Sequence, residues 1–316
     1  MDALPASPGT FASRTDAGES IVPKGQALVL FVSIAATAFA AVLILIRTRQ
    51  YLAPADFAPL VGMAGGLLAL ARFCDWRYPD KRLAHCAGIV AVGLCGLVAC
   101  GIVSNTGLRL QAPLADARLA SLDAAIGIDA GAVITQIASI PWLTAVLSFA
   151  YNASGLLVVG LIAAFAFTSR FAKAWELVTT TVTSMQVVAL VSLAAPAWGA
   201  MRHFGLEALQ GRGLPPGAGV YQWPAFAHFY EGHGATVHIS DMGGVVAFPS
   251  FHTVLALVIT QALAETRLRW IGVGCSATVI LAAIPMGGHY AADLLAGWLV
   301  WLGAALVARR VSNPSG

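Results

Sequence analysis

Apolar runs of about twenty residues recur along nearly the whole chain, and this feature constrains the fold more than any other. A run of that length matches the hydrocarbon core of a bilayer. The chain is 58% hydrophobic and only 10% charged, whereas a soluble domain carries roughly 25% charged residues. A soluble helical protein is therefore disfavoured. The pattern predicts an all-α, polytopic helical membrane protein with about eight transmembrane helices, at residues 27–46, 57–72, 84–104, 146–169, 174–197, 251–265, 270–287 and 289–308.

Arg and Lys predict the orientation of these helices. With the N-terminus inside, the inner segments hold twelve of the eighteen basic residues on the shorter total length of loop. This positive-inside bias predicts that both termini are cytoplasmic. Arg47 and Arg49 are exceptions that can sit at the interface. The net charge of +3 is small and dispersed, so it gives no reason to expect nucleic acid as a partner.

Two flanking segments and one connecting segment differ from the spans. Residues 1–26 are polar and rich in small residues, which predicts a disordered cytoplasmic tail, and residues 309–316 form a second cytoplasmic tail. In residues 105–145, Leu114, Ala117, Leu119 and Leu122 are separated by polar residues at roughly helical spacing. This spacing predicts an amphipathic helix that lies in the outer interface.

The histidines are distributed unevenly. Six of the seven, all but His85, fall on the predicted outer side or at outer helix ends. His252 begins the sixth predicted span and His289 begins the eighth, so both lie at the same membrane face. Ionisable groups at membrane depth usually mark function. We therefore expect these two histidines to meet in an active site on the outer face.

The residues around the two histidines suit phosphoryl transfer. Ser250 is a plausible N-cap for the sixth span, and a helix N-terminus attracts anions. His289 and Asp293 are four residues apart, so Asp293 can orient the imidazole and raise its nucleophilicity. His252 could then protonate a leaving alkoxide as general acid. This chemistry requires no metal and no cofactor.

These stretches carry a resemblance to a known family. Pro-Ser-Phe-His-Thr at 249–253 and Gly-His-Tyr-x-x-Asp at 288–293 resemble the second and third signature motifs of the PAP2 (type 2 phosphatidic acid phosphatase) superfamily. Ala-Ala-Pro-Ala-Trp at 194–198 resembles a motif of its inositolphosphotransferase branch, which is inositol phosphorylceramide synthase-like. The resemblance covers roughly residues 85–308.

The resemblance implies a domain organisation and roles for residues. Residues 84–308 would be a six-helix catalytic membrane domain, and residues 27–83 two additional helices. His289 would be the nucleophile that forms a phosphohistidine, His252 the acid and Asp293 the orienting group. The implied partners are a lipid phosphate or phospholipid substrate and the bilayer. The substrate contacts would come from Ser250, Gly288, Tyr290, Arg202 and Arg118.

Departures from the family pattern concern the cation that faces the phosphate. The phosphatase branch has an arginine six residues before the histidine of the third motif, where this chain has Ala283. The first phosphatase motif, a Lys and an Arg-Pro, has no match. Both departures fit the inositolphosphotransferase branch. Arg202 and then Arg118 are the candidate cations, and anchoring to lipid headgroups is an equally good explanation of both.

The expected function is a lipid phosphatase or phosphotransferase, inositolphosphotransferase-like, at the periplasmic face of a bacterial inner membrane. The acceptor, water or an alcohol, stays open. A transporter is the main alternative, although transporters carry ionisable or helix-breaking residues in the middle of several spans, and here the polar groups gather at one face. A catalytically inactive PAP2-like protein is a third reading. The loop histidines could instead bind a metal with Glu231 or Asp241, but the spacing of His228, His233 and His238 fits no known ligand pattern.

Overall fold

The computed structural model describes residues 21–312 and confirms an all-α membrane-type fold. Twelve α-helices occur in this part of the chain, with three short 3₁₀ segments and one two-stranded parallel pair, β1 (Tyr51–Leu52) with β2 (Thr236–Val237). The α-helices are α1 Lys24–Thr48, α2 Pro54–Arg77, α3 Arg82–Thr106, α4 Asp116–Ala125, α5 Ala130–Ala138, α6 Pro141–Phe167, α7 Phe171–Ser192, α8 Ala200–His203, α9 Trp223–Tyr230, α10 Phe251–Leu263, α11 Arg269–Gly287 and α12 Ala291–Ser312.

Seven of the described helices are long and apolar enough to cross a membrane: α1, α2, α3, α6, α7, α11 and α12. The remaining one of the eight expected spans, the sixth, is α10, which has only 13 residues. A helix of that length rises about 20 Å, less than the roughly 30 Å of a hydrocarbon core. Most of the two predicted tails, residues 1–20 and 313–316, lies outside the described residues.

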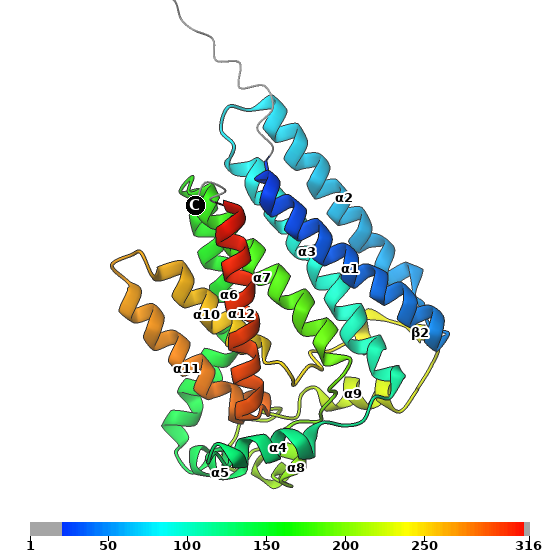
Figure 1. The fold of residues 1–316 in the computed structure, drawn as a ribbon, viewed down its shortest axis with the longest axis vertical. Helices are drawn as coiled ribbons and strands as arrows, with labels where there is room; N and C mark the ends of the chain where they lie inside the picture. Colours follow the sequence, from blue (N-terminus) through cyan, green and yellow to red (C-terminus); the bar gives the residue numbers. More distant parts are fainter. Residues whose placement is uncertain (1–20, 313–316) are drawn as a thin grey trace, which may run out of the picture.

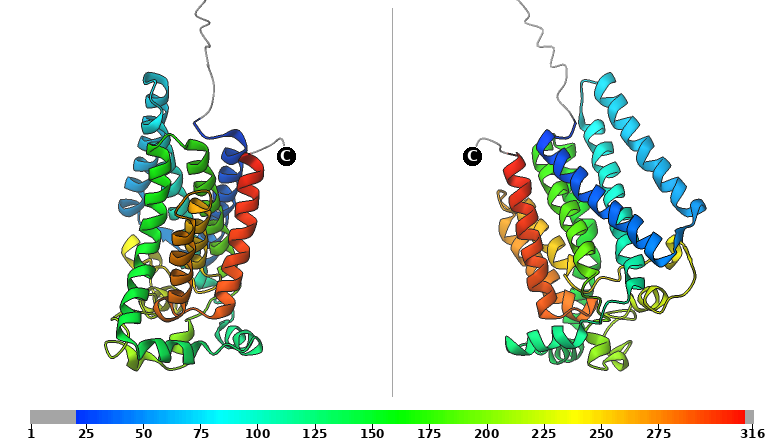
Figure 2. Two further views of the ribbon diagram at one scale, coloured as in Figure 1. Left: turned by 90° about the vertical axis from the view of Figure 1, so that its left-hand side faces the viewer. Right: turned by 45° about the vertical axis from the view of Figure 1, so that its right-hand side comes forward.

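The long helices form one bundle around α7 (Figure 1). Helix α7 packs against α1, α3, α6, α10 and α12. Of an 18-residue apolar stretch of α7, 67% is buried inside the protein, the largest share among the seven long helices. Lys24 of α1 and the end of α12 lie at one end of the bundle (Figure 2). Helices α4, α5, α8 and α9 lie at the opposite end, which we call the site end.

The two N-terminal helices are packed into this bundle. Helix α1 contacts α3, α7 and α12, whereas α2 packs mainly on α3. At the site end, the pairing of β1 with β2 joins the α1–α2 connection to the loop before α10. This loop is itself held against α3, because Asn105 donates to the Gly243 carbonyl (3.1 Å) and accepts from its N–H (3.1 Å).

A helix forms where the sequence predicted an interfacial one, and it lies across the site end (Figure 1). The buried face of α4 carries Asp116, Leu119 and Asp123. Leu114 and Leu122 are exposed instead. The two carboxylates therefore point into the protein, and their partners belong to the candidate site.

Candidate active site

His289 lies in the turn between α11 and α12, not within a helix as the predicted span 289–308 implied. Gly288 adopts a left-handed conformation (φ +71°) that ends α11, a conformation that glycine takes at no steric cost. The His289 N–H donates back to the carbonyl of Ala283 (3.3 Å). The imidazole is therefore held by the end of α11 in front of the first turn of α12.

Asp293 receives hydrogen bonds from the His289 turn. Its Oδ2 lies 3.2 Å from Nδ1 of His289 and accepts from the Tyr290 N–H at 2.9 Å. Asp293 is fully buried and His289 is 2% exposed. A buried carboxylate at this distance favours the tautomer that is protonated at Nδ1, which leaves Nε2 as the basic nitrogen.

His252 faces His289 from the first turn of α10. The centroids of the two imidazole rings are 6.3 Å apart. Ser250 caps α10 as the sequence predicted, since its hydroxyl accepts from the Thr253 N–H (3.4 Å). The Ser250 N–H donates to the Asp293 carbonyl (3.0 Å), so the backbone of α12 holds the start of α10 in place.

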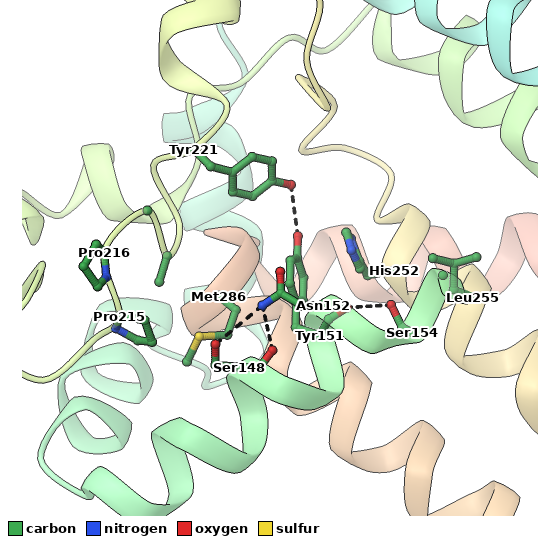
Figure 3. A pocket seen from close by; sticks show the side chains of 13 residues that line it. Ser148, Tyr151, Asn152, Ser154, Pro215, Pro216, Tyr221, His252, Leu255 and Met286 are labelled. Atoms are coloured by element: carbon green, nitrogen blue, oxygen red, sulfur yellow. Dashed lines mark hydrogen bonds between the residues drawn. The ribbon is translucent and has the colours of Figure 1, made fainter. Parts of the chain in front are cut away.

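Two tyrosines that the sequence analysis missed complete the surroundings of His252. The ring of Tyr151, on α6, stacks on His252 with centroids 3.7 Å apart and planes 18° apart. Its hydroxyl lies 3.1 Å from that of Tyr221 (Figure 3). Burial raises the pKa of Tyr221, so its hydroxyl stays uncharged and can act as a hydrogen-bond donor.

A cavity of about 410 Å³ opens beside these side chains (Figure 3). Its walls come from α6, the Pro215–Tyr221 loop, Met286 and the start of α10, including His252. His289 is not among the residues that line this cavity. A Cβ on Gly287 would come within 2.7 Å of the Tyr151 hydroxyl and 2.6 Å of the His289 ring, so glycine is required for Tyr151 and His289 to approach each other here.

Asp116 of α4 joins the Trp198–Gly199 segment to the His289 turn. Its carboxylate accepts from the N–H groups of Trp198 (3.0 Å) and Gly199 (2.9 Å) and from the Tyr290 hydroxyl (3.0 Å). Burial, with the Asp116 carboxylate alongside, raises the pKa of Tyr290. The phenol is therefore a permanent donor to Asp116.

Asp123 of α4 caps α12. Its two oxygens accept from the N–H groups of Ala291 and Ala292, each at 2.8 Å. A carboxylate at a helix N-terminus satisfies free donors and complements the helix dipole. The signal for both aspartates was present in the sequence, because a spacing of seven places Asp116 and Asp123 on one face of a helix.

The Trp198–Met201 segment touches the His289 turn directly. The Ala200 N–H donates to the Gly288 carbonyl (2.7 Å). Gly199 has φ +99°, and a Cβ there would lie 2.7 Å from the same carbonyl oxygen. The Ala-Ala-Pro-Ala-Trp stretch noted in the sequence therefore leads into a segment that supports the turn carrying His289.

Of the predicted substrate-binding residues, some are buried and others are exposed. Ser250 and Tyr290 are buried, and their hydroxyls are engaged with Thr253 and Asp116. Arg202 is exposed on α8, with its guanidinium 3.7 Å from the centroid of the Trp198 ring. Arg118 is exposed on α4. Their contacts with substrate stay predictions.

The loop histidines pair with single carboxylates. His233 lies 3.3 Å from Glu231, and His228 lies 3.9 Å from Asp241. No group of three or more His, Cys, Asp or Glu side chains suited to a metal ion occurs among residues 21–312.

Comparison with known proteins places this site in a family. The family model of the PAP2 superfamily matches residues 117–307, more than half of the chain, and the match contains α4 and both histidine motifs. Members of this superfamily are generally phosphatases or phosphotransferases. No curated protein and no solved structure gives a significant match. With a helical membrane architecture and a family model that covers more than half of the chain and both histidine motifs, this chain belongs to the PAP2 superfamily.

Proposed function

We propose that the protein transfers a phosphoryl or substituted phosphoryl group from a lipid-linked phosphate ester through a phosphohistidine at His289. The observation that carries this proposal is the buried His289–Asp293 pair (3.2 Å) with His252 facing it at 6.3 Å between ring centroids. At this ring separation, both imidazoles are close enough to act on one phosphate ester. A phosphorus atom held between the rings could be attacked from one side while its leaving oxygen is protonated from the other.

The proposed reaction has two steps. Nε2 of His289 attacks phosphorus, the bond to the leaving oxygen breaks, and His252 donates a proton to that oxygen. Water or an alcohol then attacks the phosphohistidine, His252 removes its proton, and the bond between phosphorus and Nε2 breaks. Asp293 keeps the proton on Nδ1 and stabilises the positive charge that develops on the ring.

The negative charge of the phosphate needs donors on the His252 side. Among residues 21–312, the N–H groups of Phe251 and His252 have no hydrogen-bond partner. Free N–H groups at a helix N-terminus bind anions. Arg202 and Arg118 are our proposed cations, in that order, because α8 follows the segment that supports the His289 turn, and α4 lies across the same end of the bundle.

We further propose that the protein is inositolphosphotransferase-like. Ala283, which replaces the arginine of the phosphatase branch, is fully buried, and its carbonyl accepts from the His289 N–H. A side chain as long as arginine has no free space at that position without repacking. This supports a branch in which the phosphate is recognised without that arginine.

The proposed location is a bacterial inner membrane, with the site end on the periplasmic side. Basic residues of the α2–α3, α6–α7 and α10–α11 connections and of the end of α12 all fall at the end opposite the site. The positive-inside rule assigns that end to the cytoplasm.

A turnover assay on the purified protein tests the function. Phosphatidic acid, an isoprenyl pyrophosphate, and phosphatidylinositol with ceramide would be supplied to the wild type, His289→Ala and His252→Ala. We expect one substrate class to be turned over and both variants to lose at least about a hundredfold in rate. Mass spectrometry at neutral pH should find a phosphorylated His289 peptide in the wild type. Activity that survives His289→Ala would exclude the proposed nucleophile.

A further inference from the structure

A second cavity shares Tyr221 and His252 with the first. It has a volume of about 520 Å³ and lies between α2, α3, α7, the loop before α10 and the start of α10. We call it the α3 groove. Its walls are mainly apolar side chains, and at one end it is bounded by Tyr221 and His252, which also line the first cavity. The apolar lining includes Leu60, Leu94, Leu97, Val98, Met185 and Val188.

The α3 groove has the length of one membrane leaflet. Its lining residues on α3 run from Leu94 to Asn105, a rise of about 16 Å. This is about half of a hydrocarbon core of roughly 30 Å. The polar lining residues of α3, Ser104 and Asn105, occur at the end next to His252, and the Leu94–Met185 end is apolar.

The groove is open towards the surface of the bundle. Leu97 lines it and is 60% exposed, whereas Val188 on its inner wall is 2% exposed. In a membrane, the environment of Leu97 is hydrocarbon. An elongated apolar cavity that opens to lipid and ends at polar groups suits an amphiphile with one charged head.

We propose that the α3 groove binds the hydrocarbon tail of the substrate lipid, with its phosphate at His252. This inference rests on the proposed function and adds the class of substrate: a phosphate ester with a single-leaflet tail held against α2 and α3. Both helices precede the residues 117–307 that the family model matches. The groove therefore combines residues before the matched region, from α2 and α3, with residues inside it, such as Met185 and Val188 of α7.

Narrowing the groove tests the proposal by kinetics. Leu97→Trp places a large side chain at its open edge, and Val90→Trp is the matched control, two turns away on the same face of α3, 55% exposed and outside the groove. Hexyl phosphate and hexadecyl phosphate in detergent micelles are the substrates. Each methylene that leaves water changes binding by up to about fourfold. We expect Leu97→Trp to raise KM for hexadecyl phosphate about tenfold or more and to leave hexyl phosphate and the control unchanged.

Photolabelling tests the same proposal without turnover. Hexadecyl phosphate with a diazirine at the tail end would be irradiated with the wild-type protein and with His289→Ala, and labelled peptides identified by mass spectrometry. We expect label near Leu94 and Met185, competed by unlabelled hexadecyl phosphate. Label on α6 or α11 instead, or a Leu97→Trp effect equal for both chain lengths, would overturn the α3 groove. Absence of turnover with every phosphate ester would count against the proposed function, while the labelling pattern would still decide the groove.

Discussion

Gly297 sets the distance between α10, which carries His252, and α12, which follows the His289 turn, so its replacement by alanine tests the geometry of the site. It lies on α12 against the first turn of α10. A Cβ at this position would lie 2.3 Å from the Ser250 carbonyl oxygen and 3.1 Å from Cβ of Thr253. The neighbour at 2.3 Å is backbone and cannot rotate away. Because close carbon–oxygen contacts are normally about 3.3 Å, Gly297→Ala must move α10 away from α12 by about 1 Å.

That displacement has two measurable consequences. Overpacking of a buried contact costs about 1–3 kcal/mol, so we expect the free energy of unfolding to fall by about 2 kcal/mol. His252 is carried on α10 and His289 is held beside α12, so their separation changes with the helices. A misplacement of about 1 Å can lower a rate about a hundredfold. We therefore expect kcat to fall by a larger factor than the loss of folded protein explains.

Gly303→Ala is the matched control on the same helix. A Cβ there has no neighbour within 4 Å, and replacing a helical glycine by alanine favours the helix by about 0.5–1 kcal/mol. Both variants would be unfolded in detergent with a denaturant series and assayed for turnover. If Gly297→Ala retains wild-type stability and rate, the α10–α12 contact does not position the histidines as described.

Three further predictions concern individual side chains. Asp116→Asn keeps the shape of the side chain, but it loses the charge and sets an amide donor against one backbone N–H, so we expect about 2–4 kcal/mol of destabilisation. As a control, Asp129→Asn at an exposed cap of the same end should change the free energy of unfolding by less than about 0.5 kcal/mol. Equal stability of the two variants would contradict the role of α4. Asp293→Asn should lower kcat about 10²–10⁴-fold with little change in KM, because it removes the acceptor that selects the Nδ1–H tautomer; a change confined to KM would contradict this. Burial disfavours the charged form of a phenol and so raises the pKa of Tyr221 above its usual value near 10. The hydroxyl is then neutral below that pH, and the pH–rate profiles of Tyr221→Phe and wild type should have the same shape up to about pH 10; an alkaline limb that only the wild type shows would indicate an ionising tyrosine.

Much of the fold follows from the apolar pattern. The runs predicted at 27–46 and 84–104 lie within α1 and α3, because hydrophobic length is the dominant requirement in a bilayer. The N-cap at Ser250 also follows from local chemistry. The short span predicted at 251–265 likewise corresponds to α10. The position of His289 before α12 does not follow, because the left-handed Gly288 that ends α11 is determined by tertiary contacts.

The surroundings of the histidines were harder to predict, since they depend on which face of each helix is buried. In α4 both aspartates are buried and Leu122 is exposed, whereas a water-soluble helix usually exposes its charged residues. Tyr151 lies in an apolar run and Tyr221 in a Pro- and Gly-rich loop. Neither position carries a motif, and only the packing of α6 against α10 brings Tyr151 onto the His252 ring.

The two helix N-termini at the site are not equivalent, and the difference bears on where a phosphate can bind. At α12, Asp123 accepts from the N–H groups of Ala291 and Ala292. The Tyr290 N–H donates to Asp293 Oδ2, and the Asp293 N–H donates to the Tyr290 carbonyl. A carboxylate already neutralises that end of the helix, so it holds the His289 turn rigid and repels a second anion. At α10, the described chain leaves the Phe251 and His252 N–H groups without partners, and both residues line the α3 groove. We therefore propose α10, not α12, as the helix whose N-terminus receives the phosphate, opposite His289 and without an arginine at position 283.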